Sequence, residues 1–402
     1  MDYVYVPNDI ILEKYAKLLV NFGLNNGEGI KKNEVVLISV PECAKPILKF
    51  IYREVLKNGS HPIVNFIPDD LATEIYNYGN DEQISYFPAK LLKGRADEIN
   101  HNIMILADKN PKELANIDPK KIMLKQKSVL PYRQWIDEKE NKGMYSWTLC
   151  LYPTLAKAKE AKMNLKEYWD KVIDACYLND ENPIEKWKSI QNQVKTTIKK
   201  LDSLPIDKIH VKSEKIDLWL RLGEKRKWVG CDGCNIPSFE IFTSPDWRGT
   251  NGYIEFSEPL YRYGNLIEGI KFEFKDGVIV NASATKNENI LKELISVENA
   301  NKIGEFSLTD SRFSKITSFM AETLFDENVG GKFGNTHIAI GSAYDSTYNG
   351  NVLDLNENTR KKLGFNKSAI HCDIVSTADR IVTAHLKDGT EKIIFKNGQF
   401  KV

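Results

Sequence analysis

The sequence lacks an excess of charge of either sign. Its 402 residues contain 56 Lys and Arg against 55 Asp and Glu. Because nucleic-acid binding depends on surplus positive charge, this balance disfavours nucleic acid as a partner. No apolar run approaches the ~20 residues that a helix needs to cross a bilayer. The first residues, "MDYVYVPNDI", also lack the basic region and apolar core of a secretory signal. We therefore expect no membrane association.

Cysteine is scarce and scattered. A long chain with six cysteines far apart in sequence does not match a disulfide framework, and this favours a reducing cytoplasm. Cys231 and Cys234 form a Cys-x-x-Cys motif, but no second pair completes a four-cysteine zinc site. No strand and helix typical of thioredoxin surround the motif. We therefore assign these two cysteines no function.

Two common functional motifs are also missing. The segment "SVPECAKP" follows the first predicted strand where a glycine-rich phosphate loop would stand, which disfavours dinucleotide binding. No His-Glu-x-x-His helix occurs, which argues against a mononuclear zinc protease of that type.

The first half of the chain alternates helix and strand patterns. Asn8 can cap a helix that carries Ile11, Tyr15, Leu18 and Phe22 on one face. The order of strand, helix and strand at this spacing predicts a parallel sheet. Two longer helices then follow. The predicted strands cover 34–40, 62–67 and 102–107, and the predicted helices cover 45–59, 165–178 and 183–201.

The pattern changes near Pro205. Residues 215–223 alternate apolar and polar side chains, as a half-buried strand does. "KDG" at 275–277 and 387–389 and "KNG" at 396–398 predict hairpin turns. The one predicted helix here carries Phe313, Ile316, Met320 and Leu324 on one side. We therefore expect an α/β N-terminal domain with a parallel sheet and a helical linking region, 1–205. A mostly antiparallel, β-rich (α+β) catalytic domain follows, 206–402.

A polar pair interrupts an apolar segment near the C-terminus, in "AIHCDIV" at 369–375. The β-branched residues predict a buried strand. Alternate strand residues share a face, so His371 and Asp373 project side by side. Both need partners, because burying an unpaired polar group is costly. On the strand alone, a hydrogen-bonded core pair is the simpler interpretation, and a shared metal ion is the alternative.

Further acidic and imidazole residues occur in the same half of the chain. Such groups bind Zn²⁺, Co²⁺ or Mn²⁺, and several can hold two ions bridged by one carboxylate. A metal pair activates water and polarises a carbonyl, while a Tyr hydroxyl can stabilise the oxyanion. Taken one at a time, these residues could also have only a structural role. A Glu could form an ion pair, and a Tyr could pack in the core with its hydroxyl hydrogen-bonded. The candidates are Glu240, Glu305, Glu327, His337, Tyr344, His371 and Asp373.

Several segments together resemble the thermophilic metallo-aminopeptidase family, the aminopeptidase T, S and II type. They are "NIPSFEIFTSPD", "IGEF", "FDEN" with "THIAIGSAY", and "AIHCDIV", and "WTLCLYPTLAKAKEAKM" at 147–163 resembles the linking region of that family. The resemblance implies a two-domain cytoplasmic exopeptidase. It also implies peptide substrates, a homodimer and two divalent metal ions, Zn, Co or Mn.

The resemblance also implies roles for individual residues. Glu327 would be either a metal ligand or the acid–base carboxylate, and Tyr344 would lie near the substrate carbonyl. With the other segments in view, the ligand interpretation of the 371/373 pair is the favoured one. The implied metal ligands are Glu240, Glu305, His337, His371 and Asp373.

Two other functions are consistent with the same residues. The first keeps the metal pair but acts on a small amide in place of peptides. The second is a peptide-binding protein without catalysis, in which the polar residues only satisfy a core.

Overall fold

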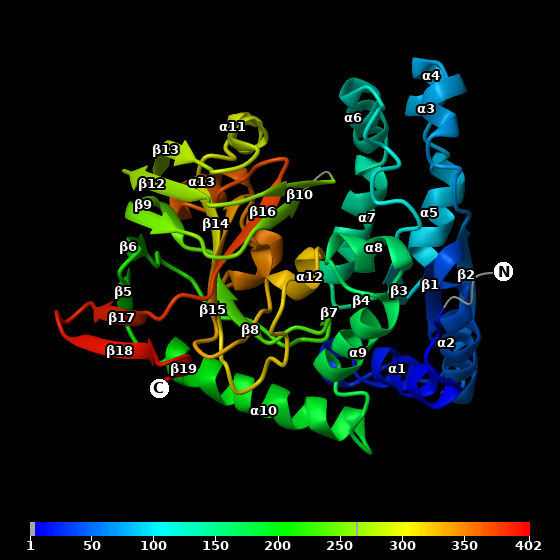
Figure 1. The fold of residues 1–402 in the computed structure, drawn as a ribbon, viewed down its shortest axis with the longest axis horizontal. Coiled ribbons are helices and arrows are strands. Elements are labelled where there is room, and N and C mark those ends of the chain that lie inside the picture. Colours follow the sequence, from blue (N-terminus) through cyan, green and yellow to red (C-terminus); the bar gives the residue numbers. More distant parts are fainter. Residues whose placement is uncertain (1–4, 263) are drawn as a thin grey trace. The chain divides into compact units, whose positions relative to one another are not determined.

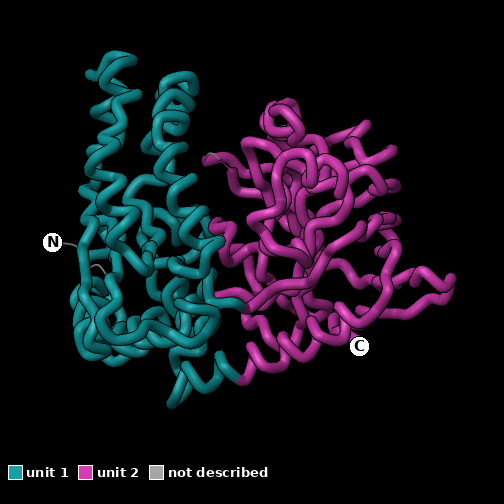
Figure 2. The backbone as a smooth tube through the Cα atoms, turned by 180° about the vertical axis from the view of Figure 1, so that it is seen from behind, with its two compact units in different colours: residues 1–188, 232–236 teal, residues 189–231, 237–402 magenta. Residues whose placement is uncertain are grey.

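The computed structural model describes residues 5–262 and 264–402, which form two compact units (Figures 1 and 2). One unit comprises residues 1–188 with 232–236, and the other comprises 189–231 with 237–402. The domain limits predicted from the sequence, 1–205 and 206–402, stay a prediction, because compactness alone does not show which segments fold independently.

The first unit contains the predicted parallel sheet. Its strand order is β2-β1-β3-β4-β7, and every neighbouring pair is parallel. Parallel neighbours need crossover connections, and helices supply most of them. The strands are β1 Val35–Pro41, β2 His61–Ile67, β3 His101–Leu106, β4 Ser146–Leu151 and β7 Asn235–Ile236.

The helices of the first 202 residues begin at the expected residues, but those predicted to end at 178 and 59 end at Ala175 and Lys57. The Asn8 side chain accepts the Ile11 N–H at 3.0 Å, Gly59 has a φ of +72° just past α2, and α10 begins at Pro183. The helices are α1 Asp9–Asn21, α2 Lys45–Lys57, α3 Glu74–Tyr78, α4 Asp81–Ser85, α5 Ala89–Glu98, α6 Pro119–Ser128, α7 Leu130–Asn141, α8 Leu155–Glu160, α9 Leu165–Ala175 and α10 Pro183–Asp202.

The second unit is β-rich and mostly antiparallel, as predicted. Its larger sheet has the order β13-β12-β9-β6-β5-β17-β18-β19. The three predicted turns connect β12 to β13, β17 to β18 and β18 to β19, each with a glycine at positive φ. The strands are β5 Ile206–Lys212, β6 Ile216–Arg221, β9 Asp246–Glu255, β12 Lys271–Lys275, β13 Val278–Ser283, β17 Ile381–Leu386, β18 Glu391–Lys396 and β19 Gln399–Phe400.

A smaller four-stranded antiparallel sheet of this unit has the order β16-β15-β14-β8. Every residue of its two central strands is buried, so both faces are covered. Polar side chains within such strands need partners inside the protein. The strands are β8 Glu240–Thr243, β14 Ile303–Thr309, β15 Asn335–Gly341 and β16 His371–Ser376, and a separate hairpin joins β10 Leu260–Arg262 to β11 Asn265–Ile267.

The helix predicted around Phe313 and Leu324 is wrong. Phe313, Ile316, Met320 and Leu324 are buried, but only α12, Thr323–Asp326, is helical here. The Asp326 carboxylate accepts the N–H groups of Met320 and Glu322, and Ala321 has a φ of +52°. Side-chain acceptors therefore replace the helical bonds of this segment. Two helices that were not predicted are α11 Glu288–Ser296 and α13 Glu357–Leu363.

Two of the expectations from sequence concern the cysteines and the helices. Across the described residues, no helix combines the length and hydropathy of a bilayer-spanning segment. All six cysteines are free thiols. Burial raises the pKa of the Cys234 thiol well above its usual value, with Asp232 and Glu140 adding to the effect. This shift keeps the thiol protonated, and a protonated thiol is a poor metal ligand.

Candidate metal centre

The four-stranded sheet brings the predicted ligands together from four different strands. Glu240 begins β8, Glu305 lies in β14 and His337 lies in β15. His371 and Asp373 lie in β16 and share a face, as predicted. In register, Glu305 and Asp373 both pair with Ala339, so the two carboxylates flank one small residue in a single row.

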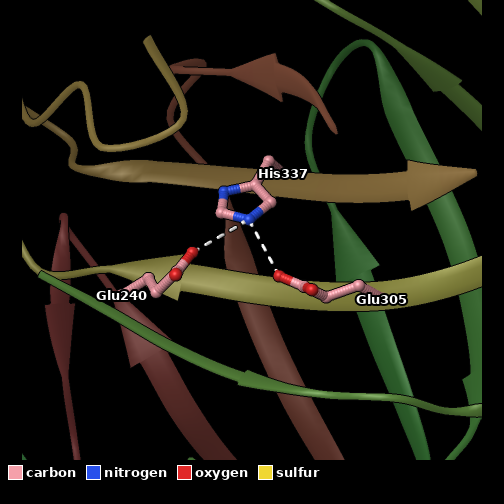
Figure 3. Close-up of side chains that lie close together, drawn as sticks. All are labelled: Glu240, Glu305 and His337. Atoms are coloured by element: carbon pink, nitrogen blue, oxygen red, sulfur yellow. Dashed lines mark hydrogen bonds and ion pairs between the residues drawn. The ribbon is translucent and has the colours of Figure 1, made fainter. Parts of the chain in front are cut away.

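The first cluster of possible ligands centres on His337 (Figure 3). The His337 Nε2 lies 3.1 Å from Glu305 Oε1 and 3.2 Å from Glu240 Oε2. The imidazole is 1% exposed and the Glu305 carboxylate 3%. The three ligand atoms offered by Glu240, Glu305 and His337 lie within 4.8 Å of one another, which is close enough for one cation to contact all three.

A second cluster adjoins the first through Glu305. The His371 Nε2 lies 3.5 Å from Glu305 Oε2 and 3.3 Å from Asp373 Oδ1. These three residues again offer atoms within 4.8 Å of one another. The two oxygens of Glu305 thus face different clusters. One carboxylate with this placement is suited to bridge two cations.

Main-chain carbonyls hold both imidazoles in an orientation that suits metal binding. The His337 Nδ1–H donates to the Glu327 carbonyl at 3.1 Å, and the His371 Nδ1–H donates to the Ser342 carbonyl at 2.8 Å. With Nδ1 protonated in this way, the lone pair of Nε2 is available to a cation. A metal-binding histidine is held in this way at the nitrogen that does not bind the ion. A histidine and a carboxylate that only satisfy each other in a core need just the hydrogen bond between them.

The electrostatics of the centre also fit cations. Four carboxyl groups, those of Glu240, Glu305, Glu327 and Asp373, face two imidazoles, so the acidic groups outnumber the basic ones. Burial, then Glu240 and Asp373, raise the pKa of Glu305 to about 7 against the opposing bond from His337. Divalent cations would offset this repulsion.

The remaining titratable groups respond to the same crowding. Burial alone would lower the pKa of His337, but its bonds to Glu240 and Glu305 outweigh it and hold that pKa well above the usual value. Burial likewise opposes a charged His371, yet Asp373 and Glu305 raise its pKa to about 9. Burial would raise the pKa of Asp373, and His371 holds it below the usual range. Protons thus occupy positions that cations could take.

Glu327 has a different position from the other candidates. Among the described residues, it belongs to neither cluster of three ligand atoms. It follows α12 directly and is 8% exposed. Asn335 Nδ2 donates to the Glu327 carbonyl at 2.8 Å and to the Val329 carbonyl at 2.6 Å, which anchors the loop. Burial, then Glu240 and Asp373, raise the pKa of the Glu327 carboxyl well above its usual value, so it can hold a proton.

Tyr344 lies beside the second cluster. Its ring centroid is 4.6 Å from that of His371, and its N–H donates to Ser244 Oγ at 2.9 Å. Partial loss of water and the carboxylates of Glu305 and Asp373 raise the pKa of its hydroxyl well above the usual value. The hydroxyl therefore stays protonated and can donate a hydrogen bond.

Several contributing residues were not identified from the sequence. Asn328 accepts the Phe239 N–H at 2.7 Å and so connects the strand end at Glu240 to the Glu327 loop. Arg262, at the end of β10, is close enough to lower the pKa of Asp373. The period of two along a strand could have found Asn335, two residues before His337. Nothing local marks Arg262.

The pKa shifts predict how pH affects the metal-free protein. The raised pKa values of Glu305 and His371 mean that the fold binds these protons more tightly than the unfolded chain does. Stability should therefore decrease as pH rises from 4.5 to about 7 for Glu305 and from 6.5 to about 9 for His371. Thermal unfolding of chelated protein across this range measures the effect.

The same protons compete with cations, so affinity for Zn²⁺ should increase with pH over the same range. Calorimetric titration in two buffers of different ionisation enthalpy would detect the released protons. Saturation with Zn²⁺ is the control, and it should remove the loss of stability at high pH. Equal stability of the chelated protein at both ends of the range would contradict the assignment.

The chain is similar to known metalloproteases and aminopeptidases along nearly its whole length. The family described as thermophilic metalloprotease (M29) matches residues 8–400. Aminopeptidase AmpS of Bacillus subtilis is 28% identical over 97% of this chain and 98% of its own length, and aminopeptidase T of Thermus thermophilus is 27% identical over 97% and 98%.

The fold is shared with a solved structure as well. Wild-type AmpT from Thermus thermophilus superposes with a TM-score of 0.84 at 24% identity, over 98% of this chain and 99% of that one. Because the family match extends over nearly the whole sequence, the chain belongs to the thermophilic metalloprotease (M29) family.

Proposed function

We propose that this protein is a metal-dependent aminopeptidase that removes the N-terminal residue of peptides at a centre of two divalent cations. The family and the names of its aminopeptidase relatives support the reaction. The single observation that supports a pair of ions is Glu305, whose two oxygens face two separate clusters of ligand atoms.

The donor set restricts which ions are suitable. Mixed imidazole and carboxylate ligands suit Zn²⁺, Co²⁺ and Mn²⁺, and the described residues around the centre include no thiolate. Glu240 and His337 would hold one ion, His371 and Asp373 the other, and Glu305 both. We assign Glu327 as the acid–base carboxylate, because it lies outside both clusters.

The reaction follows from where protons can be held. Bound divalent cations lower the pKa of water and polarise a scissile carbonyl. Glu327 takes the proton of the attacking water and returns it to the leaving amine, which its raised pKa permits. The Tyr344 hydroxyl donates to the oxyanion of the tetrahedral intermediate. A carboxylate or a metal ion of the centre would bind the free α-amine of a substrate, which would explain exopeptidase action.

The experiment that tests this function combines chelation with blocked substrates. Chelated protein should lose its activity, and refilling with Zn²⁺, Co²⁺ or Mn²⁺ should restore it at about two ions per chain. Dipeptides with a free amine should be cleaved, and their N-acetylated counterparts should not. Equal cleavage of both would favour the small-amide hydrolase, and a protein that stays inactive with every metal would favour a binding protein.

We further propose a cytoplasmic homodimer. The free cysteines are consistent with a reducing compartment. The edge strand β2 exposes Ile63, Phe66 and Ile67 at 41–46% of their surface, which a second copy could cover. Analytical ultracentrifugation would refute the dimer if it found only single chains at micromolar concentration.

A further inference from the structure

The side chains of the candidate metal centre are more exposed to solvent near His371 than near His337. The side chains of His337 and Glu305 are 1% and 3% exposed, whereas His371 is 20% exposed and the residue Tyr344 is 45% exposed. A ligand therefore reaches the centre past His371 and Tyr344. The residues along this approach are the ones that a substrate contacts first.

Aromatic rings line this approach. Phe242 follows Glu240 by two residues in β8, so both side chains share a face, and it is the one partly exposed residue of that strand. Its ring centroid lies 5.6 Å from that of Tyr344, which lies 4.6 Å from His371. We call Phe242 and Tyr344 the aromatic wall.

Main-chain contacts hold the aromatic wall in place. Phe242 exchanges two backbone hydrogen bonds of 2.9 Å with Val229. The buried Arg226 donates to the carbonyls of Ser244, Glu224 and Leu363, and the Ser244 hydroxyl accepts the Tyr344 N–H. The backbone that carries the two rings is therefore held in place before a ligand binds, which lowers the cost of ordering the wall.

We propose that the aromatic wall binds the side chain of the first substrate residue and makes the enzyme prefer large apolar N-terminal residues. This inference rests on the proposed aminopeptidase function. The Cα of the first residue is bonded to the scissile carbonyl, so its side chain must lie within a few ångströms of the centre. Packing on Phe242 and Tyr344 removes its apolar surface from water.

Charge contributes to the same preference. An acidic first residue would lose water from its carboxylate where it packs on the two rings, and neither ring offers it a cationic partner. Glycine would leave the wall uncovered. The expected order of kcat/KM is therefore Phe and Leu above Ala, then Gly, with Asp lowest.

The test uses Phe242→Ala and the dipeptides Phe-Gly, Leu-Gly, Ala-Gly and Asp-Gly, which share one leaving residue. The ratio of kcat/KM for Phe-Gly to that for Ala-Gly should fall about tenfold in this variant. Phe242→Leu, a milder change, should lower the ratio less. Metal content should stay at the wild-type value in both variants.

Phe87→Ala is the matched control. Phe87 is also half-buried and packs on one aromatic partner, Trp135, at 5.7 Å, but it lies in the other compact unit. Its removal should leave the ratio unchanged. A second readout is the rise in melting temperature of metal-loaded protein on adding L-phenylalanine, which should exceed that with glycine in the wild type and lose its excess in Phe242→Ala.

The outcomes separate this inference from the proposed function. If the wild type cleaves free dipeptides but Phe242→Ala keeps the wild-type ratio, the aromatic wall does not select the first residue and the aminopeptidase function stands. If the wild type cleaves none of them with any metal, the proposed function fails. The melting-temperature comparison then decides the inference, and equal shifts in wild type and Phe242→Ala overturn it.

Discussion

Replacing Glu305 by Gln should remove more than about 99% of the activity and most of the bound metal. Glu305 is the one residue common to both ligand clusters, so the change weakens both at once. Loss of a residue that only orients a ligand already costs roughly 10- to 100-fold in metal affinity, and a shared ligand should cost more. Metal analysis after dialysis and dipeptide cleavage at saturating Zn²⁺ measure the two effects.

The metal-free variant should at the same time be at least as stable as the metal-free wild type. The substitution retains the shape of the side chain but removes a carboxylate that burial and two neighbouring carboxylates disfavour. Glu54→Gln is the matched control, since Glu54 is a buried glutamate outside the centre that accepts a bond from Asn21. A Glu305→Gln protein with two ions and normal turnover would refute the shared-ligand assignment.

Replacing Glu327 by Gln should lower kcat by about 10²- to 10⁴-fold, the range of general acid–base catalysis. Because Glu327 lies outside both ligand clusters, metal content should stay at the wild-type value and KM should change little. The amide of the variant cannot carry a proton between water and the leaving amine. The pH dependence of kcat should therefore lose the limb that reports this carboxyl.

Glu322→Gln is the control, and it tests whether loss of any carboxylate near α12 lowers kcat. Glu322 directly precedes α12 and belongs to neither ligand cluster. It should retain wild-type kcat. If Glu327→Gln instead loses one ion per chain, Glu327 is a ligand. The acid–base assignment would then be wrong, and the proton would need another carrier.

Local patterns predicted much of the fold. The strand at 215–223 and the turns "KDG" and "KNG" are determined by alternation and by glycine, which act within a few residues. The same period of two placed His371 and Asp373 on one face before any partner was known. Such predictions succeed because neighbours in sequence decide them.

The predicted helix across Phe313 and Met320 shows where this reasoning fails. The spacing of the buried residues suits a helix. However, Ser314 Oγ donates to the Asn328 carbonyl, and the Asp326 carboxylate accepts hydrogen bonds from two backbone N–H groups. These bonds join residues that are 4 to 14 positions apart, and the spacing of the apolar side chains gives no sign of them. The spacing of the apolar residues therefore predicted correctly that they are buried, but predicted the wrong secondary structure.

The sequence by itself determined the types and order of the candidate ligands and the strand that carries His371 and Asp373, because strand formation depends on local side-chain chemistry. The tertiary structure alone decided that Glu305 turns one oxygen to each histidine, that main-chain carbonyls orient both imidazoles, and that Phe242 borders the approach. Strand pairing joins segments far apart in the chain, and the register of that pairing is set by packing over the whole sheet rather than by any one segment.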